Sequence, residues 1–140
     1  MEIKTIYSPP AEVTEAIERG LHEHNLAVLG PEVIYNYAKF AIAARDEAGQ
    51  ITGGLIGRFL WGALKIDTLW VSEEKRGQDL GTRLIAQAEA EARQRGVSLI
   101  YLETTSFQAR AFYEKNGFQV YGQLDDYPKG HTWYHMRKML

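Results

Sequence analysis

The segment that most constrains this 140-residue chain runs from Leu69 to Thr82, where an apolar stretch turns through a glycine-containing loop into a helical pattern. Apolar residues recur every three or four positions over residues 80–95, and Gly96 follows at a place where helices often end. Residues 97–103 are apolar enough to form a second strand. A strand, a helix and a strand in this order predict a βαβ unit with two parallel strands.

The rest of the chain predicts further strands and helices around this unit. The predicted fold class is therefore mixed α/β, with a mostly antiparallel sheet that contains one parallel pair. Gly53, Gly54 and Gly57 within one predicted strand indicate a bulge or a close approach of another backbone. Before residue 50 we expect a strand at 3–7, a helix begun by Ser8, Pro9 and Pro10 with Val13, Ile17 and Leu21 on one face, an irregular connection at 22–37 with a short helix near 32–37, and a strand at 40–45. After it we expect strands at 51–61 and 63–71, the helix at 80–95, a strand at 97–103, a helix from Ser106 to residue 115, and strands at 118–122 and 131–139.

Composition excludes several classes of protein. The chain is 45% hydrophobic and has no cysteine, so it has no thiol nucleophile, thiolate zinc site or disulfide. Its net charge is −2 with no block of like charges, so no nucleic-acid partner is expected. The first residues lack the apolar run of a secretory signal, and residues 53–64 are too short to cross a bilayer. We expect one cytoplasmic domain, residues 1–140, with no membrane partner.

The loop between the first parallel strand and its helix has the features of an anion site. The amide hydrogens of a first helical turn have no partner within the helix, and the helix dipole is positive there. Arg76 adds a positive charge, while Gly77 and Gly81 bring no side chain that would obstruct an anion. A pyrophosphate group would fit this loop. The alternative is that these residues only form the turn.

A second segment, residues 112–118, reads Phe-Tyr-Glu-Lys-Asn-Gly-Phe and lies beyond the next predicted strand. Together the two segments resemble the GNAT superfamily of acetyl-CoA-dependent N-acetyltransferases. The phosphate loop of that family begins with Arg or Gln and ends with Gly or Ala, and Arg76 and Gly81 match these ends. Its later signature is an aromatic-Tyr-Glu-Lys-x-Gly-Phe run, matched here without a gap. The order of predicted elements is also that of the family, so the resemblance covers essentially the whole chain.

The resemblance implies that acetyl-CoA is the co-substrate and assigns residues to it. The pantetheine arm would run along the backbone of Leu69, Trp70 and Val71, where one amide hydrogen would stabilise the oxyanion formed from the thioester. Tyr113 would protonate the leaving thiolate, the alternative being a core aromatic residue. Ser106 stands where the family often has Asn, and we expect it to cap the following helix and to hydrogen-bond the cofactor. The amides expected to hold the pyrophosphate are those of Arg76, Gly77, Gln78, Asp79, Leu80, Gly81 and Thr82.

Asp79 departs from the family pattern, because it occupies the position of the middle glycine of the phosphate loop. It places a carboxylate where two phosphates are expected and brings a β-carbon into a tight turn. The alternative is that Asp79 caps the helix, since aspartate tolerates both capping and left-handed geometry. A cap would use an amide hydrogen that the pyrophosphate needs. We therefore predict that Asp79→Gly tightens the binding of acetyl-CoA.

A proton acceptor is also needed, because a primary amine with a pKa near ~10.4 is almost fully protonated at neutral pH. Asp67 is one candidate, since alternation along its strand puts it on the same face as Leu69 and Val71. Glu103 is another, because it closes the neighbouring parallel strand at the end where ligands collect. Alternatively, Asp67 pairs with a neighbouring strand and Glu103 braces the loop at 104–106.

These observations predict an N-acetyltransferase that moves the acetyl group of acetyl-CoA to a primary amine of a small molecule or peptide, by direct attack on the thioester. Asp125, Asp126 and His131 could complete an acidic acceptor pocket or form a solvated turn. The histidines lack the spacing of metal ligands, so no metal is expected. A non-catalytic acyl-CoA-binding or regulatory domain is the alternative, and a domain for another phosphorylated ligand is a third. A homodimer is an expectation of the family only.

Overall fold

The computed structural model describes residues 1–140, which form two compact units, Met1–Tyr35 and Asn36–Leu140. Each unit is described by itself. The first holds α1 (Ala11–Leu29) and α2 (Pro31–Ile34), and neither helix buries a residue. Gly30 ends α1 with a φ of +81°, a conformation that glycine adopts readily. No helix is both long and apolar enough to cross a membrane.

The N-terminal unit differs from the sequence prediction. Residues 3–7 form no strand, and α1 begins after Pro10 without a side-chain cap, so the prediction of Ser8 as a cap is wrong. Alternating side chains alone do not make a strand, because a strand needs hydrogen-bonded neighbours. α1 also continues through residues 22–29, where an irregular connection was expected. His22 and His24 are exposed there, and an exposed helix surface tolerates such polar residues.

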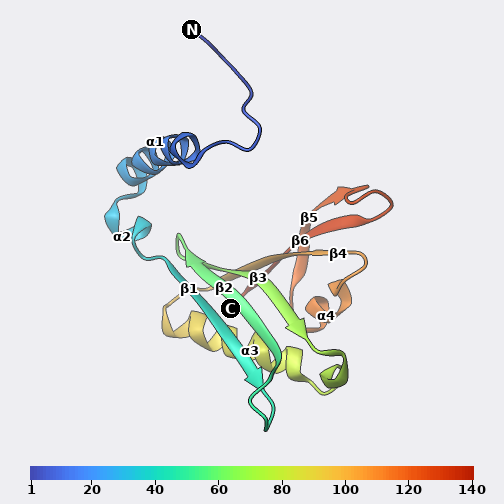
Figure 1. Ribbon diagram of the computed structural model, residues 1–140. Helices are drawn as coiled ribbons and strands as arrows, with labels where there is room; N and C mark the ends of the chain where they lie inside the picture. Colours follow the sequence, from blue (N-terminus) through green and yellow to red (C-terminus); the bar gives the residue numbers. More distant parts are fainter. The chain divides into compact units, whose positions relative to one another are not determined.

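The second unit is built on a six-stranded sheet with the strand order β1-β2-β3-β4-β6-β5 (Figure 1). β3 and β4 are its one parallel pair of neighbours, so the predicted mixed sheet is confirmed. The predicted helices that follow β3 and β4 are also present, as α3 and α4. The elements are β1 (Ala38–Arg45), β2 (Ile51–Leu60), β3 (Ala63–Val71), a 3-10 turn (Glu73–Lys75), α3 (Leu80–Gln94), β4 (Leu99–Thr105), α4 (Arg110–Lys115), β5 (Gln119–Asp125) and β6 (Thr132–Met139).

The core of this unit lies between α3 and the sheet. α3 packs against β1, β2 and β3, and Ala88 and Ala92 on its inner face are fully buried. These small side chains let the helix backbone lie close to the strands. The buried apolar cluster continues to Tyr113 of α4, so both helices are held by one core. Its members are Leu55, Phe59, Leu64, Ile66, Leu84, Ile85, Ala88, Ala92, Val97, Ile100, Leu102, Tyr113, Phe118 and Met136.

The glycines of β2 allow a close approach of the neighbouring backbones, as the sequence predicted. The register with β1 shifts between Ala44 and Arg45 and leaves Thr52 of β2 without a partner beside Gly53, which is the predicted bulge. The register with β3 also shifts, between Ile56 and Gly57, but there the extra residue belongs to β3. A β-carbon at Gly54 would lie 2.8 Å from the carbonyl oxygen of Ile42 in β1, and one at Gly57 would lie 3.2 Å from that of Lys65 in β3. A side chain at Gly54 would therefore push β1 and β2 apart.

β3 and β4 separate after a short stretch of pairing. Their parallel register holds only Leu64 with Ile100 and Lys65 with Tyr101. β4 nevertheless stays paired with β6 along its whole length. The carboxyl-terminal halves of β3 and β4 thus form a wedge without ladder hydrogen bonds across it, which confirms the predicted splayed pair. This is the end of an α/β sheet at which ligands bind.

A largely buried ion pair joins α3 to the last strand, and we expect its loss to destabilise the fold. Lys138 Nζ of β6 bonds to Glu89 of α3, whose side chain is 12% exposed, and donates to the carbonyl oxygen of Asn116 at 2.8 Å. Lys138→Met leaves the Glu89 carboxylate with only the exposed Arg93, whose Nη1 lies 3.7 Å from Oε2, so the free energy of unfolding in urea should fall by about 2 kcal/mol. Adding Glu89→Met should restore most of it. An unchanged urea midpoint in the single variant would contradict this account.

Candidate functional site

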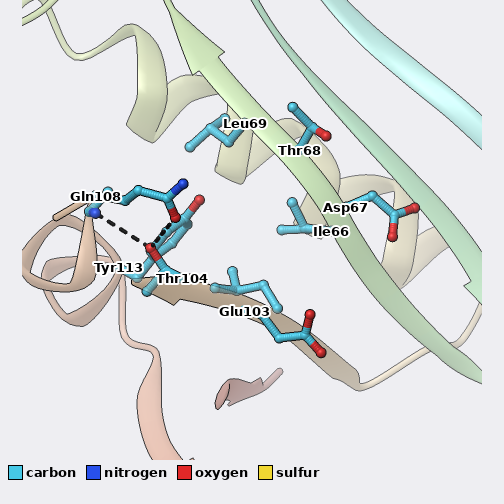
Figure 2. A pocket seen from close by; sticks show the side chains of 10 residues that line it. Ile66, Asp67, Thr68, Leu69, Glu103, Thr104, Gln108 and Tyr113 are labelled. Carbon is cyan, nitrogen blue, oxygen red and sulfur yellow. Dashed lines mark hydrogen bonds between the residues drawn. The ribbon is translucent and has the colours of Figure 1, made fainter. Parts of the chain in front are cut away.

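The wedge between β3 and β4 holds a cavity of about 290 Å³, at the small end of the range for ligand pockets. Its walls come from β3 on one side and from β4 and the start of α4 on the other (Figure 2). The cavity brings together all three residues for which the sequence predicts catalysis, Tyr113, Glu103 and Asp67. Its lining residues are Ile66, Asp67, Thr68, Leu69, Leu102, Glu103, Thr104, Gln108, Ala109 and Tyr113.

Tyr113 is the most buried titratable group of the cavity. It is 7% exposed, and its ring packs edge-on against Phe112 and Phe118 at centroid distances of 5.2 and 5.7 Å. Its hydroxyl group lies on the cavity side, beside Gln108 (Figure 2). Burial raises the pKa of Tyr113 to about 12, so the phenol keeps its proton at neutral pH. The ring belongs to the core, and the hydroxyl group is available as a proton donor.

Thr104 and Gln108 fix the start of α4 beside the cavity. Thr104 Oγ1 donates to Gln108 Oε1 at 3.4 Å and accepts from the amide of Ala109 at 3.4 Å (Figure 2). Gln108 Oε1 also accepts from the amide of Thr105 at 3.2 Å. Sequence reasoning missed this pair, because a threonine in an apolar strand carries no sign of the loop that will return to it.

Ser106 does not cap α4, so that prediction is wrong. The helix begins four residues later, at Arg110, and its N-terminal flanking residue makes no side-chain cap. Ser106 Oγ instead accepts from the amide of Thr132 at 3.1 Å and lies 3.3 Å from His131 Nδ1. The Ser106 hydroxyl therefore ties the loop after β4 to the start of β6.

Asp67 lines the cavity, but the predicted direction of its side chain is wrong. It is the extra residue at the bulge between β2 and β3, and this bulge shifts the alternation along β3. Leu69 and Val71 pack against the core, whereas Asp67 lies on the opposite face with Oδ2 3.3 Å from Arg58 Nε. The Nε–H does not align with the carboxylate, so this contact is an ion pair without a good hydrogen bond. Its carboxylate points away from Tyr113 (Figure 2).

Glu103 lies at the rim of the cavity between two nitrogen-bearing side chains. Its Oε1 atom is 3.8 Å from Lys65 Nζ of β3 and 3.6 Å from His135 Nδ1 of β6. The Glu103 side chain is 33% exposed, and its carboxylate points outward at the rim, away from Tyr113 (Figure 2). Sequence reasoning placed Glu103 near the end of its strand but missed His135, because the β4–β6 register decides which residue lies opposite it.

The loop after β3 leads through the 3-10 turn into α3 and is braced by its own side chains. Arg76 Nε donates to the carbonyl oxygen of Val71 at 3.2 Å, and Gln78 Nε2 donates to that of Glu74 at 3.1 Å. Gly77 has a φ of +75°, which a residue with a β-carbon rarely adopts. No side chain caps α3, so its first amide hydrogens remain available to an anion.

Asp79 precedes α3 in a left-handed conformation, with φ 60° and ψ 10°. Its side chain makes no capping hydrogen bond, so the alternative in which Asp79 caps the helix is wrong. Its backbone carbonyl oxygen still accepts from the amide of Arg83 at 3.0 Å. The Asp79 carboxylate thus leaves the helix amides free but adds a negative charge near them.

Gly81 joins the start of α3 to α4, a role beyond the anion access that the sequence suggested. A β-carbon at Gly81 would lie 3.0 Å from Cζ of Phe112, so its absence lets the two helices meet. Asn116 Nδ2 donates to Thr82 Oγ1 at 3.5 Å and to the carbonyl oxygen of Phe112 at 2.9 Å. The loop at the start of α3 is therefore packed directly against the helix that carries Tyr113.

Comparisons with known proteins find acetyltransferases. Residues 2–118 match the model of the Acetyltransferase (GNAT) family. Blasticidin-S acetyltransferase of Streptomyces morookaense is 44% identical over 94 residues, which are 66% of this chain and 69% of that protein. Acetyltransferase Atu2258 of Agrobacterium fabrum is 36% identical over 125 residues, 82% of this chain and 91% of that protein. The crystal structure of an acetyltransferase from Bacillus cereus matches with a TM-score of 0.90 at 34% identity and covers 98% of both chains.

The splayed sheet and its cavity, together with these relatives, define the class as an acyltransferase. The chain belongs to the GNAT family of acetyltransferases. The resemblance drawn from the residues around Arg76 and Tyr113 is thereby confirmed.

Proposed function

We propose that the chain transfers the acetyl group of acetyl-CoA to the primary amine of a small molecule or peptide. The observation that carries the proposal is the cavity at the split of β3 and β4, because it joins a free backbone edge, a buried proton donor and a carboxylate. Two relatives support it. One is named for the acetylation of blasticidin S, and a 26% identical protein of Bacillus anthracis, with a TM-score of 0.65, was crystallised with acetyl coenzyme A.

The residues around the wedge fit a coenzyme that has a diphosphate and a long, narrow arm. The uncapped amides of the first turn of α3 would bind the diphosphate, and Arg76 would add a positive charge. At Leu69, Trp70 and Val71, β2 pairs with one edge of β3, but β4 has already separated from the other edge. That free edge would hydrogen-bond the amides of the arm. The cavity volume of about 290 Å³ suits the end of such an arm rather than a whole coenzyme.

The chemistry then assigns a proton acceptor and a proton donor on opposite sides of the thioester. Glu103 takes a proton from the acceptor's ammonium group, which frees the nitrogen lone pair to attack the carbonyl carbon. A backbone amide of β3 donates a hydrogen bond to the oxyanion. Tyr113 gives its proton to the leaving sulfur, and its raised pKa of about 12 keeps that proton in place until then. Asp67 is the weaker candidate for the base, because its carboxylate lies closer to a cation, 3.3 Å from Arg58 Nε, than that of Glu103, which lies 3.8 Å from Lys65 Nζ.

Release of free thiol from acetyl-CoA across a panel of amines tests the proposal. We expect turnover with at least one primary amine and none with the matching tertiary amine, which cannot lose a proton to form an amide. If acetyl-CoA raises the melting temperature but no amine releases thiol, the chain is an acyl-CoA-binding module. If ATP raises the melting temperature and acetyl-CoA does not, the ligand belongs to another phosphorylated class.

Asp79→Gly is expected to tighten the binding of acetyl-CoA about tenfold, because it removes a negative charge near the diphosphate and relieves a left-handed non-glycine residue. Isothermal titration calorimetry measures the change. Asp79→Asn is the matched control, since asparagine tolerates the same backbone but has no charge. A gain shared by both variants assigns the effect to charge, whereas a gain in the glycine variant alone assigns it to the backbone. Unchanged or weaker binding of Asp79→Gly would contradict the prediction.

A further inference from the structure

A cross-strand pair on the rim of the cavity adds a residue to the proposed mechanism. Glu103 of β4 lies directly opposite His135 of β6 in the antiparallel register. The two side chains are 33% and 30% exposed, and Glu103 Oε1 lies 3.6 Å from His135 Nδ1. At this separation the two atoms make no hydrogen bond, so a hydrogen bond between them requires a small side-chain rotation. Of the two residues, only Glu103 lines the cavity, so His135 reaches the reaction through Glu103.

The orientation of the imidazole ring fixes which nitrogen meets the carboxylate. A β-carbon built at Gly122 of β5 would lie 3.9 Å from His135 Cδ2, so this edge of the ring faces β5 while Nδ1 faces β4. Nε2 has no hydrogen-bonding partner in the protein. A carboxylate opposite Nδ1 favours the tautomer that carries its proton on Nδ1, because that nitrogen can then donate to Glu103.

Glu103 has a second neighbour, and the two neighbours act differently on it. Lys65 Nζ lies 3.8 Å from Glu103 Oε1 and carries a full positive charge. A neutral histidine supplies a hydrogen bond without cancelling the charge of Glu103. Lys65 lies on β3 and His135 on β6, so the two side chains flank the Glu103 carboxylate from opposite sides of β4, and the contact with His135 keeps it from turning fully to Lys65.

We infer that His135 is a positioning residue that holds the Glu103 carboxylate at the cavity rim, through a hydrogen bond from Nδ1, for removal of the acceptor's proton. The inference rests on the proposed function. In the balanced step, Glu103 takes one proton from the ammonium group, the nitrogen forms its bond to the acetyl carbon, and the carbon–sulfur bond breaks as sulfur takes the Tyr113 proton. The nitrogen loses its second proton to water, and water gives a proton back to the Tyr113 oxygen. Glu103 releases the proton that it took from the ammonium group to solvent.

Two variants of His135 separate positioning from other roles. Asparagine places an amide donor where Nδ1 lies, whereas leucine keeps a similar volume without a donor. We expect His135→Leu to lower kcat about tenfold or more with little change in the KM for acetyl-CoA, and His135→Asn to recover most of this loss. His24→Leu and His24→Asn make the same chemical changes at an exposed site of α1 and should leave kcat unchanged. Melting temperatures confirm that each variant is folded.

The tautomer of His135 gives a readout that needs no turnover. Nitrogen-15 NMR of the neutral imidazole should show the proton on Nδ1 in the wild-type chain and its transfer to Nε2 in Glu103→Leu. A proton on Nε2 in the wild type would overturn the inference, as would His135→Asn that is no more active than His135→Leu. If no amine is acetylated by the wild type, the proposed function fails, and the tautomer still decides whether the contact between His135 and Glu103 exists.

Discussion

Tyr113→Phe is expected to lower kcat about 100-fold while leaving the KM for acetyl-CoA nearly unchanged. The substitution removes the hydroxyl group beside the cavity and keeps the ring that packs between Phe112 and Phe118. The leaving thiolate would then have to take its proton from water. Initial rates of thiol release at saturating amine measure the effect. Tyr35→Phe, at an exposed tyrosine of the N-terminal unit, is the matched control and should behave as the wild type.

The stability of the same variant at high pH tests the burial of the phenol. Burial raises the pKa of Tyr113 from 10 to about 12 in the folded chain, so ionisation above pH 10 favours the unfolded chain. The stability that Tyr113 contributes is complete below pH 10 and is lost as the pH rises toward 12. Relative to Tyr113→Phe, the wild type should therefore lose free energy of unfolding between pH 10 and 12. A pH-independent difference between the two chains would show that the hydroxyl group is not buried.

Arg76→Glu is expected to raise the KM for acetyl-CoA about 100-fold and to leave kcat at saturation within a few-fold of the wild type. The variant reverses a charge beside the uncapped start of α3, where the diphosphate is proposed to bind. It also removes the hydrogen bond to the carbonyl oxygen of Val71. Steady-state kinetics with varied acetyl-CoA measure both constants, and calorimetry measures the binding directly.

Arg76→Gln separates the charge from the hydrogen bond, because glutamine keeps a donor that can reach Val71. We expect its KM to lie between those of the wild type and Arg76→Glu. Arg19→Glu makes the same charge reversal on α1 and is expected to leave the KM unchanged. Equal KM values for Arg76→Glu and the wild type would place the diphosphate elsewhere and remove the anion site from the proposal.

Much of the second unit could be predicted from the sequence, because local patterns determine its elements. The helical spacing over residues 80–95 and the glycines that end α3 and α4 act within a few residues of their own positions. The prediction of a strand at 3–7 was wrong, since a strand depends on a partner strand that no local pattern specifies. The predictions of a single domain, a cytoplasmic location and a homodimer stay predictions.

The candidate site was predictable where it depends on a motif and unpredictable where it depends on register. Tyr113 and Glu103 lie in one cavity; the sequence pointed to Tyr113 through its motif and to Glu103 through its place near the end of a parallel strand. The predicted direction of the Asp67 side chain was wrong, because one extra residue at the β2–β3 bulge reverses the alternation of side chains along β3. His135 was missed because its neighbour lies 32 positions away and is set by the pairing of β4 with β6.

A crystal structure of the chain with acetyl-CoA and an unreactive analogue of the acceptor amine tests the central claim most directly. We predict the diphosphate on the first amides of α3, the thioester in the cavity between β3 and β4, and the sulfur within hydrogen-bond distance of Tyr113. The nitrogen of the analogue should face Glu103. A coenzyme bound outside the wedge, or a sulfur remote from Tyr113, would contradict the account.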